Sequence, residues 1–188
     1  ALDRVHHRYL IYPFAPSDLV TVTLQQDTSP PGYTGVADTY IYQYSPAENY
    51  ASASELKINN GGSLLGLLKF DLGAIPTDAV IKKAHLTLYL ANSQSSGIDV
   101  SLYRLIPHWV DTEATWDRAA NDQRWSVPGV AGEDVDYDPT PISVVPNVRY
   151  SGPYVFNLKP VLKDWLTGAV PNEGVLIAGP RPGGSGSI

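Results

Sequence analysis

The chain of 188 residues carries 13 lysines and arginines against 19 aspartates and glutamates, a formal net charge of −6. This acidic balance argues against nucleic acid and anionic membrane surfaces as partners. The absence of cysteine excludes a disulfide framework and a thiolate metal site. No apolar run approaches the roughly 20 residues that a membrane helix requires, so we expect no membrane insertion.

Turn-forming and aromatic residues indicate the fold class. With 16 glycines, 16 prolines and 12 tyrosines, the chain is typical of many short strands joined by turns. A chain of this length is commonly a single domain in all-β proteins. Methionine is absent, and the start at Ala1 predicts removal of a signal peptide and a secreted, extracellular protein.

The first predicted strand stands apart from the others. It consists of Arg8, Tyr9, Leu10, Ile11 and Tyr12, aromatic and β-branched for the most part. The linker 13–18 contains two prolines, which prevent a tight hairpin and favour an extended spacer. We therefore expect an N-terminal strand extension over residues 1–18 and a sandwich domain over residues 19–188.

Strand patterns are dense in the first half of the domain. Residues 20–24 alternate apolar and polar side chains, which predicts a half-buried strand, and a second strand is predicted over residues 37–42. Residues 56–58 and 64–70 flank an Asn-Asn-Gly-Gly turn, the strongest hairpin signal in the chain. Because residues 64–70 are apolar on both faces, we expect a central strand covered on both sides.

The second half adds further strands and one helix. Strand composition recurs at residues 84–90, 100–105, 154–158 and 174–178. Between them, residues 111–141 are rich in loop-forming residues, with one helical turn predicted near residues 117–120. Residues 160–166 predict a short helix that begins with a proline and ends at Gly168. The whole pattern favours an all-β, jelly-roll-like β-sandwich with one short helix and the N-terminal strand extension.

A series of short motifs carries a family resemblance. They are Asp38-Thr39-Tyr40-Ile41, Leu67-Leu68-Lys69-Phe70-Asp71-Leu72, Ile75-Pro76, Ala79 to Leu86, Val100 to Arg104, Trp109, Glu113, Thr115, Trp116, Trp125, Pro128-Gly129, Asp136-Tyr137-Asp138, Trp165-Leu166 and Asn172 to Val175. In this order they resemble the DNRLRE domain, also called the disaggregatase-related repeat, which is similar to family-96-type carbohydrate-binding modules. The resemblance covers about Val20 to Ile188 and implies a secreted or cell-surface jelly roll, usually an accessory module beside enzymes or adhesins.

The two ends of the chain depart from the family pattern. That pattern ends in a Ser-Arg-Glu-like strand and a closing strand of the type Pro-x-Leu-Val-Val-x-Tyr, and neither is present near Ile188. Residues 8–12 are similar to the closing strand but lie at the opposite end. A missing strand would expose two or three apolar side chains, each worth about 1.5–3 kcal/mol when buried.

Strand donation follows as the leading hypothesis. If residues 8–12 fill the groove of a neighbouring copy, head-to-tail exchange builds an extracellular, pilus-like filament, with copies of the same chain as partners. The alternative is that the strand fills the groove of its own domain, because six extended linker residues span about 20 Å and permit either course. A functional alternative is a monomeric carbohydrate-binding module that recognises polysaccharide.

Aromatic residues are the candidate glycan contacts. Tyr40, Tyr42 and Tyr44 alternate with Ile41, so we expect a tyrosine ladder on one face that contacts glycan or another subunit. The four tryptophans are better explained as structural, packing loops and the short helix against the sandwich. They are Trp109, Trp116, Trp125 and Trp165.

An acidic loop is the candidate metal site. Asp134, Asp136 and Asp138 alternate beside Glu133, and carboxylate oxygens at this density could hold structural calcium. The alternative is a solvated loop in which the aspartates cap turns. No other cofactor is expected.

Catalytic signals are weak. The four histidines are His6, His7, His85 and His108. None belongs to a motif with a catalytic mechanism. Glu113 and Asp117 could form a glycosidase pair, but acidic residues are common in loops. We therefore expect a protein that is not an enzyme.

Overall fold

The computed structural model describes residues 19–180. Its strands and helix are β1 (Val36–Tyr42), β2 (Leu64–Phe70), β3 (His85–Leu90), β4 (Ile98–Arg104), β5 (Arg118–Ala120), β6 (Gln123–Arg124), β7 (Ser143–Val148), β8 (Gly152–Asn157), α1 (Lys159–Thr167) and β9 (Val175–Ala178). The predicted N-terminal strand, residues 8–12, lies outside the described residues.

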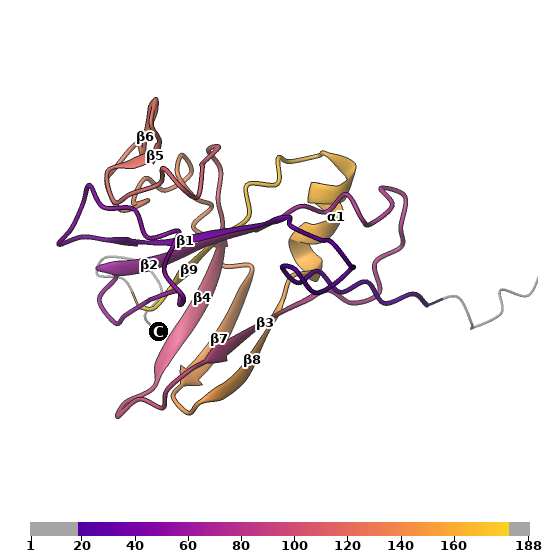
Figure 1. Ribbon diagram of the computed structural model, residues 1–188, viewed down its shortest axis with the longest axis horizontal. Coiled ribbons are helices and arrows are strands. Elements are labelled where there is room, and N and C mark those ends of the chain that lie inside the picture. The colour runs from indigo at the N-terminus through magenta and orange to yellow at the C-terminus, as the bar shows by residue number, and fades with distance from the viewer. Residues whose placement is uncertain (1–18, 181–188) are drawn as a thin grey trace, which may run out of the picture.

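Two antiparallel sheets form the layers of the domain (Figure 1). The larger has the order β1-β2-β9-β4-β7, and the smaller consists of β3 and β8 alone. A separate hairpin, β5-β6, projects from the loops beside the larger sheet. The prediction of an all-β sandwich with one short helix is confirmed.

The pairing register assigns side chains to the two faces of the larger sheet. Residues opposite each other in an antiparallel ladder share a face, so Ile41 lies with Leu65 on one face and Tyr40 with Gly66 on the other. The first face belongs to the loop-side core, which consists of Ile41, Leu65, Leu67, Leu105, Trp109, Ala114, Ala119, Trp125, Val130, Tyr137, Leu176 and Ala178. The second face belongs to the helix-side core, which consists of Leu68, Leu86, Val100, Leu102, Phe156, Val161, Leu162, Trp165, Leu166, Val175 and Ile177.

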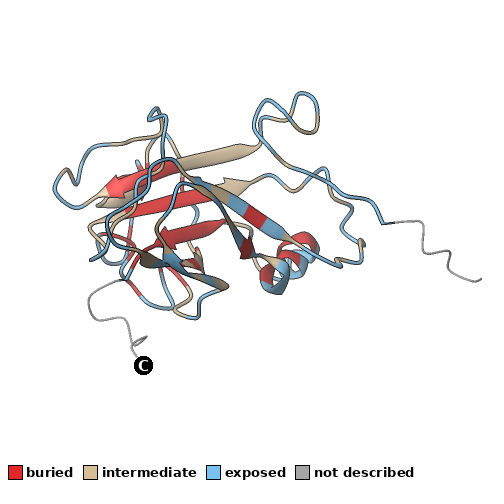
Figure 2. Ribbon diagram, turned by 90° about the horizontal axis from the view of Figure 1, so that it is seen from below, coloured by how far each residue is buried: buried red, intermediate tan, exposed pale blue. Residues whose placement is uncertain are grey.

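The short helix α1 closes one end of the helix-side core. Pro160 stands in its first turn, where its missing N–H has no helical partner to lose. Gly168 ends the helix at φ 71°, a left-handed conformation that glycine adopts without strain. Figure 2 shows buried residues on one side of α1 and along the middle strands of the larger sheet. Within residues 19–180, no helix has the length and apolar character needed to cross a bilayer.

The predicted strand over residues 20–24 is wrong. This stretch pairs with no described strand, and Val20 and Val22 are 85% and 40% exposed. An alternating pattern becomes a strand only where a neighbouring strand buries its apolar side. Here the chain passes instead into the turns of residues 25–32.

Residues 56–58 are also not a strand. They run as an extended segment across the helix-side core, close to Gly66 on β2. A Cβ at Gly66 would lie 3.7 Å from Cγ2 of Ile58 and 3.3 Å from Cβ of Ile177. Glycine therefore lets this segment pack closely on the sheet without joining it.

Two predictions in the second half are corrected. The helical turn expected near residues 117–120 is instead strand β5, whose carbonyl groups at Arg118 and Ala119 accept hydrogen bonds from Thr115 and Val110. Strand β7 was not predicted, because Pro146 lies within it. As the edge strand of the larger sheet β7 tolerates this proline, and its register against β4 is irregular there.

Candidate functional site

The exposed edge of β3 is the most distinctive feature of the smaller sheet. The N–H of Leu158 donates to the carbonyl of Ala84 at 2.9 Å, which continues the β3-β8 ladder by one pair. Because hydrogen-bonded pairs alternate in an antiparallel ladder, Leu86, Leu88 and Leu90 direct their N–H and C=O groups towards β8. Those of His85, Thr87 and Tyr89 point the other way, where no described strand pairs with β3.

The other sheet edges are better covered. The outer edge of β8 runs beside β7, and the N–H of Asn157 donates to Oγ of Ser143 at 3.1 Å. On β1, the ring of Tyr40 is 6% exposed and stacks on Tyr50 at 4.3 Å. At the start of β1 the N–H of Val36 donates to Oε1 of Gln26. Among the described strands, β1 and β3 each have an edge that no strand pairs, and the edge of β3 is the one in the smaller, two-stranded sheet.

Coverage of the two cores differs. Sixteen further hydrophobic residues of the described part are only partly buried against the helix-side core, compared with three against the loop-side core. The sixteen include Ile58, Leu88 and Ile98, which come from the extended segment, β3 and β4. The smaller sheet, with two strands, leaves apolar surface of the larger sheet incompletely covered.

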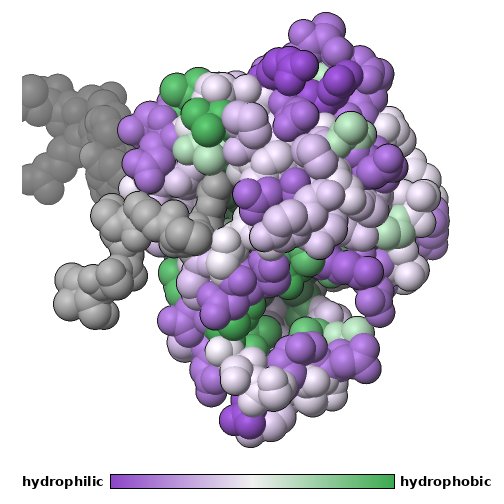
Figure 3. All heavy atoms as spheres, turned by 90° about the vertical axis from the view of Figure 1, so that its left-hand side faces the viewer, coloured by the Kyte–Doolittle hydropathy of each residue, from purple (hydrophilic) through white to green (hydrophobic). Residues whose placement is uncertain are grey.

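This incomplete coverage shows at the surface of the molecule. The side of the molecule that Figure 3 faces, on the left in Figure 1, is hollowed between the layers, with hydrophobic atoms in its depth and hydrophilic residues around it. The backbone of Gly179, just after β9, approaches Ile98 of β4, since a Cβ at Gly179 would lie 3.1 Å from Cδ1 of Ile98. The open edge of β3 borders the helix-side core, to which Leu86 of that strand belongs and against which Leu88 packs.

Buried indole groups distinguish the cores in the same way. In the loop-side core, Nε1 of Trp109 donates to the carbonyl of Glu173 at 2.7 Å and Nε1 of Trp125 to that of Thr115 at 2.9 Å. In the helix-side core, Nε1 of Trp165 is buried without a partner among the described residues. A buried donor without an acceptor costs about 1–3 kcal/mol. The predicted structural role is confirmed for Trp109, Trp125 and Trp165, which are buried, while Trp116 packs partly buried against the loop-side core. Of these four tryptophans, Trp165 alone has a buried N–H without a partner among the described residues.

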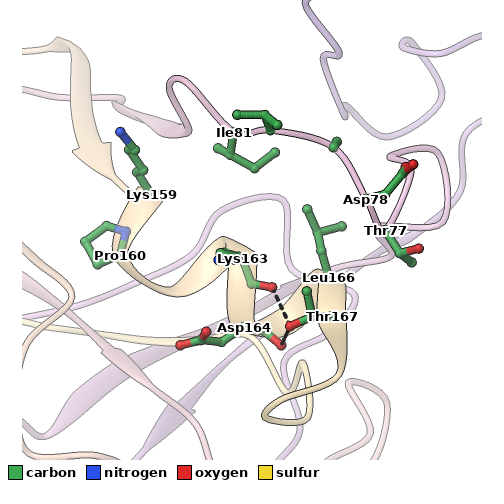
Figure 4. A pocket seen from close by; sticks show the side chains of 11 residues that line it. Thr77, Asp78, Ile81, Lys159, Pro160, Lys163, Asp164, Leu166 and Thr167 are labelled. Carbon is green, nitrogen blue, oxygen red and sulfur yellow. Dashed lines mark hydrogen bonds between the residues drawn. The ribbon is translucent and has the colours of Figure 1, made fainter. Parts of the chain in front are cut away.

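A cavity of about 530 Å³ lies between α1 and the chain before β3. Ile81 and Leu166 face the same space from its two walls, with Asp78 and Lys159 at opposite ends (Figure 4). Its charged lining holds two lysines and two aspartates, so the signs balance and favour neither an anion nor a cation. The cavity has no feature that selects a ligand.

The structure does not form the predicted tyrosine ladder. Tyr40 and Tyr42 share a face of β1, but Tyr40 is covered by Tyr50 and by the ammonium group of Lys57, 5.7 Å above its ring. Tyr44 lies beyond the strand, is 74% exposed and packs edge-on against Tyr42 at 5.5 Å. Of these three tyrosines, only Tyr42 and Tyr44 therefore offer an aromatic surface to a ligand.

One carboxylate of β1 itself, that of Asp38, is partly buried. Burial, together with the nearby negative charge of Asp111, raises the pKa of Asp38 above its ordinary value.

The three aspartates of the predicted calcium site do not converge. Asp136 is 2% exposed and its carboxylate accepts hydrogen bonds from the N–H groups of Ser126, Val127 and Gly132 at 2.7–3.1 Å. Asp138 pairs instead with Arg104 at 3.3 Å, and Asp134 is exposed at φ 60°. Within residues 19–180 no three acidic or histidine side chains are grouped to hold a metal ion. Asp136 agrees instead with the alternative that the aspartates cap turns of the loop, because its carboxylate accepts backbone hydrogen bonds.

Two of the candidate catalytic residues take part in hydrogen bonds within their own loop. The carboxylate of Glu113 accepts a hydrogen bond from the N–H of Asn121, and the N–H of Asp117 donates to Oγ1 of Thr115. His108 is exposed and lies 3.3 Å from the carboxylate of Glu173, while His85 is exposed on β3. His6 and His7 lie outside the described residues. A non-enzymatic role stays a prediction.

Comparison with known proteins adds no assignment. The sequence matches no protein-family model, and no curated protein is significantly similar to it. The resemblance to the DNRLRE domain stays a prediction. The unpaired N–H and C=O groups of His85, Thr87 and Tyr89 were not predicted. The alternating pattern of residues 84–90 indicates which side chains face inward, but it does not indicate which edge of the strand stays unpaired.

Proposed function

We propose that this protein is a non-catalytic subunit of an extracellular filament that assembles by strand donation. Residues 8–12 of one copy add to the free edge of β3 in the next copy, and no cofactor is required. The observation that carries the proposal is the open edge of β3 beside an incompletely covered core. The partner is another copy of the same chain.

The energetics of the open edge support strand addition. An added strand gains main-chain hydrogen bonds from the edge and specificity from its alternate side chains. Each large apolar side chain that it buries contributes about 1.5–3 kcal/mol. Two such side chains would supply a large fraction of the 5–15 kcal/mol by which domains are typically stable. A strand edge with unpaired N–H and C=O groups is also prone to pair with other chains.

The arrangement of the ends supports exchange between copies. The described part of the chain begins on the right-hand side of Figure 1, the side that also holds α1, and the hollow opens on the opposite side (Figures 1 and 3). A strand that leaves one end and binds at the other end of the next copy makes a head-to-tail contact. Such a contact builds an open filament when the rotation between subunits does not close a ring. Completion of the sheet within one copy is the competing outcome.

A replacement experiment tests the proposal. Residues 8–12 are exchanged for a Gly-Ser stretch of equal length, and residues 13–16 are exchanged in the same way as the matched control. Negative-stain imaging and size-exclusion chromatography then compare the two variants with the full chain. We expect filaments from the full chain and the control, and monomers from the first variant. Filaments at normal yield from the first variant would overturn the proposal. It would also be overturned if the full chain is a monomer and the replacement of residues 8–12 lowers its stability, because the strand would then complete its own domain.

Glycan recognition is a second candidate function, favoured by the exposed ring of Tyr44 against Tyr42. It requires a monomeric module that binds polysaccharide through this pair. A glycan array with the full chain and with Tyr44→Ala tests it, because retention that is lost in the variant would support recognition at this surface. Equal retention of both proteins would remove it.

A further inference from the structure

The unpaired groups of β3 determine how an added strand must face. Thr87 and Tyr89 direct their side chains to solvent on the outer face of the smaller sheet, and Tyr89 is 76% exposed. A residue level with Thr87 in an added strand shares that outer face. Its neighbours on either side therefore point inward, beside Leu86 and Leu88 of β3.

The five residues of the donor segment allow two facings. In one, Tyr9 and Ile11 point into the helix-side core. In the other, Arg8, Leu10 and Tyr12 do. The second places the guanidinium group of Arg8 against a cluster built from apolar residues, none of them acidic. A buried charge without a partner is strongly unfavourable.

We infer that Tyr9 and Ile11 are the core-facing residues of the added strand, and that Arg8, Leu10 and Tyr12 lie on the outer face. This inference rests on the proposed function and specifies the side chains that the acceptor site receives. In the antiparallel register that sets Leu10 level with Thr87, Arg8 lies level with Tyr89. The cation of Arg8 can then pack on the exposed ring of Tyr89.

The outer surface beside the open edge fits this facing. On the β3-β8 ladder, Tyr89 is opposite Pro153 and Thr87 is opposite Val155, so this part of the outer face carries no charge. Val155 is 53% exposed. Leu10 would therefore extend an existing uncharged surface and Tyr12 would lie level with the exposed His85, while Arg8 keeps contact with water.

A pair of charge substitutions in adjacent residues tests the facing. Ile11→Asp places a carboxylate in the core, whereas Leu10→Asp, its matched control, places it on the outer face. We expect the protein concentration needed for filaments to rise about 10- to 100-fold in Ile11→Asp. In Leu10→Asp it should change less than about threefold, as surface substitutions do.

A substitution on β3 tests the acceptor side. Thr87→Pro removes the N–H that faces the open edge, and an edge strand tolerates proline on that side. Thr87→Ala keeps the N–H and serves as the control. We expect Thr87→Pro to block filament formation. The melting temperature of the Thr87→Pro monomer should lie within a few degrees of that of the Thr87→Ala monomer.

The outcomes separate the inference from the proposed function. Filaments blocked by Leu10→Asp but not by Ile11→Asp would overturn the facing and leave strand donation in place. Filaments that form equally well with both donor substitutions and with Thr87→Pro would overturn strand donation itself. If Thr87→Pro does not fold, the donor pair still decides, because those substitutions lie outside the acceptor domain.

Discussion

The indole Nε1 of Trp109 donates a 2.7 Å hydrogen bond to the main-chain oxygen of Glu173, just before β9. The carboxylate of Glu173 binds the ammonium group of Lys69 on β2 at 3.2 Å, and that ammonium lies 5.3 Å from the Trp109 ring. This contact joins the loop over one core to two central strands of the larger sheet. It helps to hold together the loop-side core, which is the better covered of the two cores.

Trp109→Phe should destabilise the domain by about 1–3 kcal/mol, because it leaves the carbonyl of Glu173 buried without its donor. Urea unfolding followed by circular dichroism measures the loss. Trp116→Phe, in the same loop but only partly buried, is the control and should cost less. Equal losses in the two variants would show that volume, and not the hydrogen bond, sets the effect.

Asp136→Asn should destabilise the domain by about 1.5–3 kcal/mol, since an amide replaces a carboxylate that accepts three backbone hydrogen bonds. For a domain of this size the melting temperature should fall by roughly 2–4 °C per kcal/mol. The control is Asp134→Asn in the same loop, where the side chain is exposed and the change should be close to zero. Chelation by EDTA should leave the melting temperature of the wild-type protein unchanged. A fall on chelation would instead support the predicted calcium site.

Asp38→Asn should stabilise the protein at neutral pH. Burial and the charge of Asp111 raise the pKa of Asp38, so the folded state binds its proton more tightly than the unfolded state does. The carboxyl group therefore favours folding below its ordinary pKa, and that contribution is lost as the pH rises through the raised pKa.

Thermal melts between pH 3 and pH 7 measure this effect. The advantage of Asp38→Asn over wild type should be present at pH 7 and shrink as the pH falls through the raised pKa towards the ordinary pKa of aspartate. Asp78→Asn, at an exposed carboxylate, is the matched control for the loss of one negative charge. An advantage of Asp38→Asn that does not depend on pH would contradict the assigned cause.

Local patterns in the sequence predicted the elements that depend on local chemistry. Residues 64–70 form β2 because their apolar run suits a strand covered on both faces, and α1 begins and ends at its proline and glycine. Residues 20–24 have an equally regular pattern but no partner strand. β7 was not predicted because Pro146 lies within it. The proline is tolerated there because β7 is an edge strand of the larger sheet.

The candidate site depends on contacts between distant segments. β9 enters between β2 and β4, about 100 residues after β2, and thereby leaves two strands for the smaller sheet. The burial of Tyr40 depends on Tyr50, across a loop. Neither relationship follows from a local pattern, so the open edge of β3 and the loss of the tyrosine ladder could not be predicted.

Backbone hydrogen exchange tests the central claim most directly, because it reports on each amide of β3 separately. In the variant that lacks the donor sequence at residues 8–12, the amides of Leu86 and Leu88 should exchange slowly and those of Thr87 and Tyr89 rapidly. In filaments of the full chain, all four should exchange slowly. Slow exchange of Thr87 and Tyr89 in the isolated variant, or rapid exchange of both in filaments, would contradict strand addition at this edge.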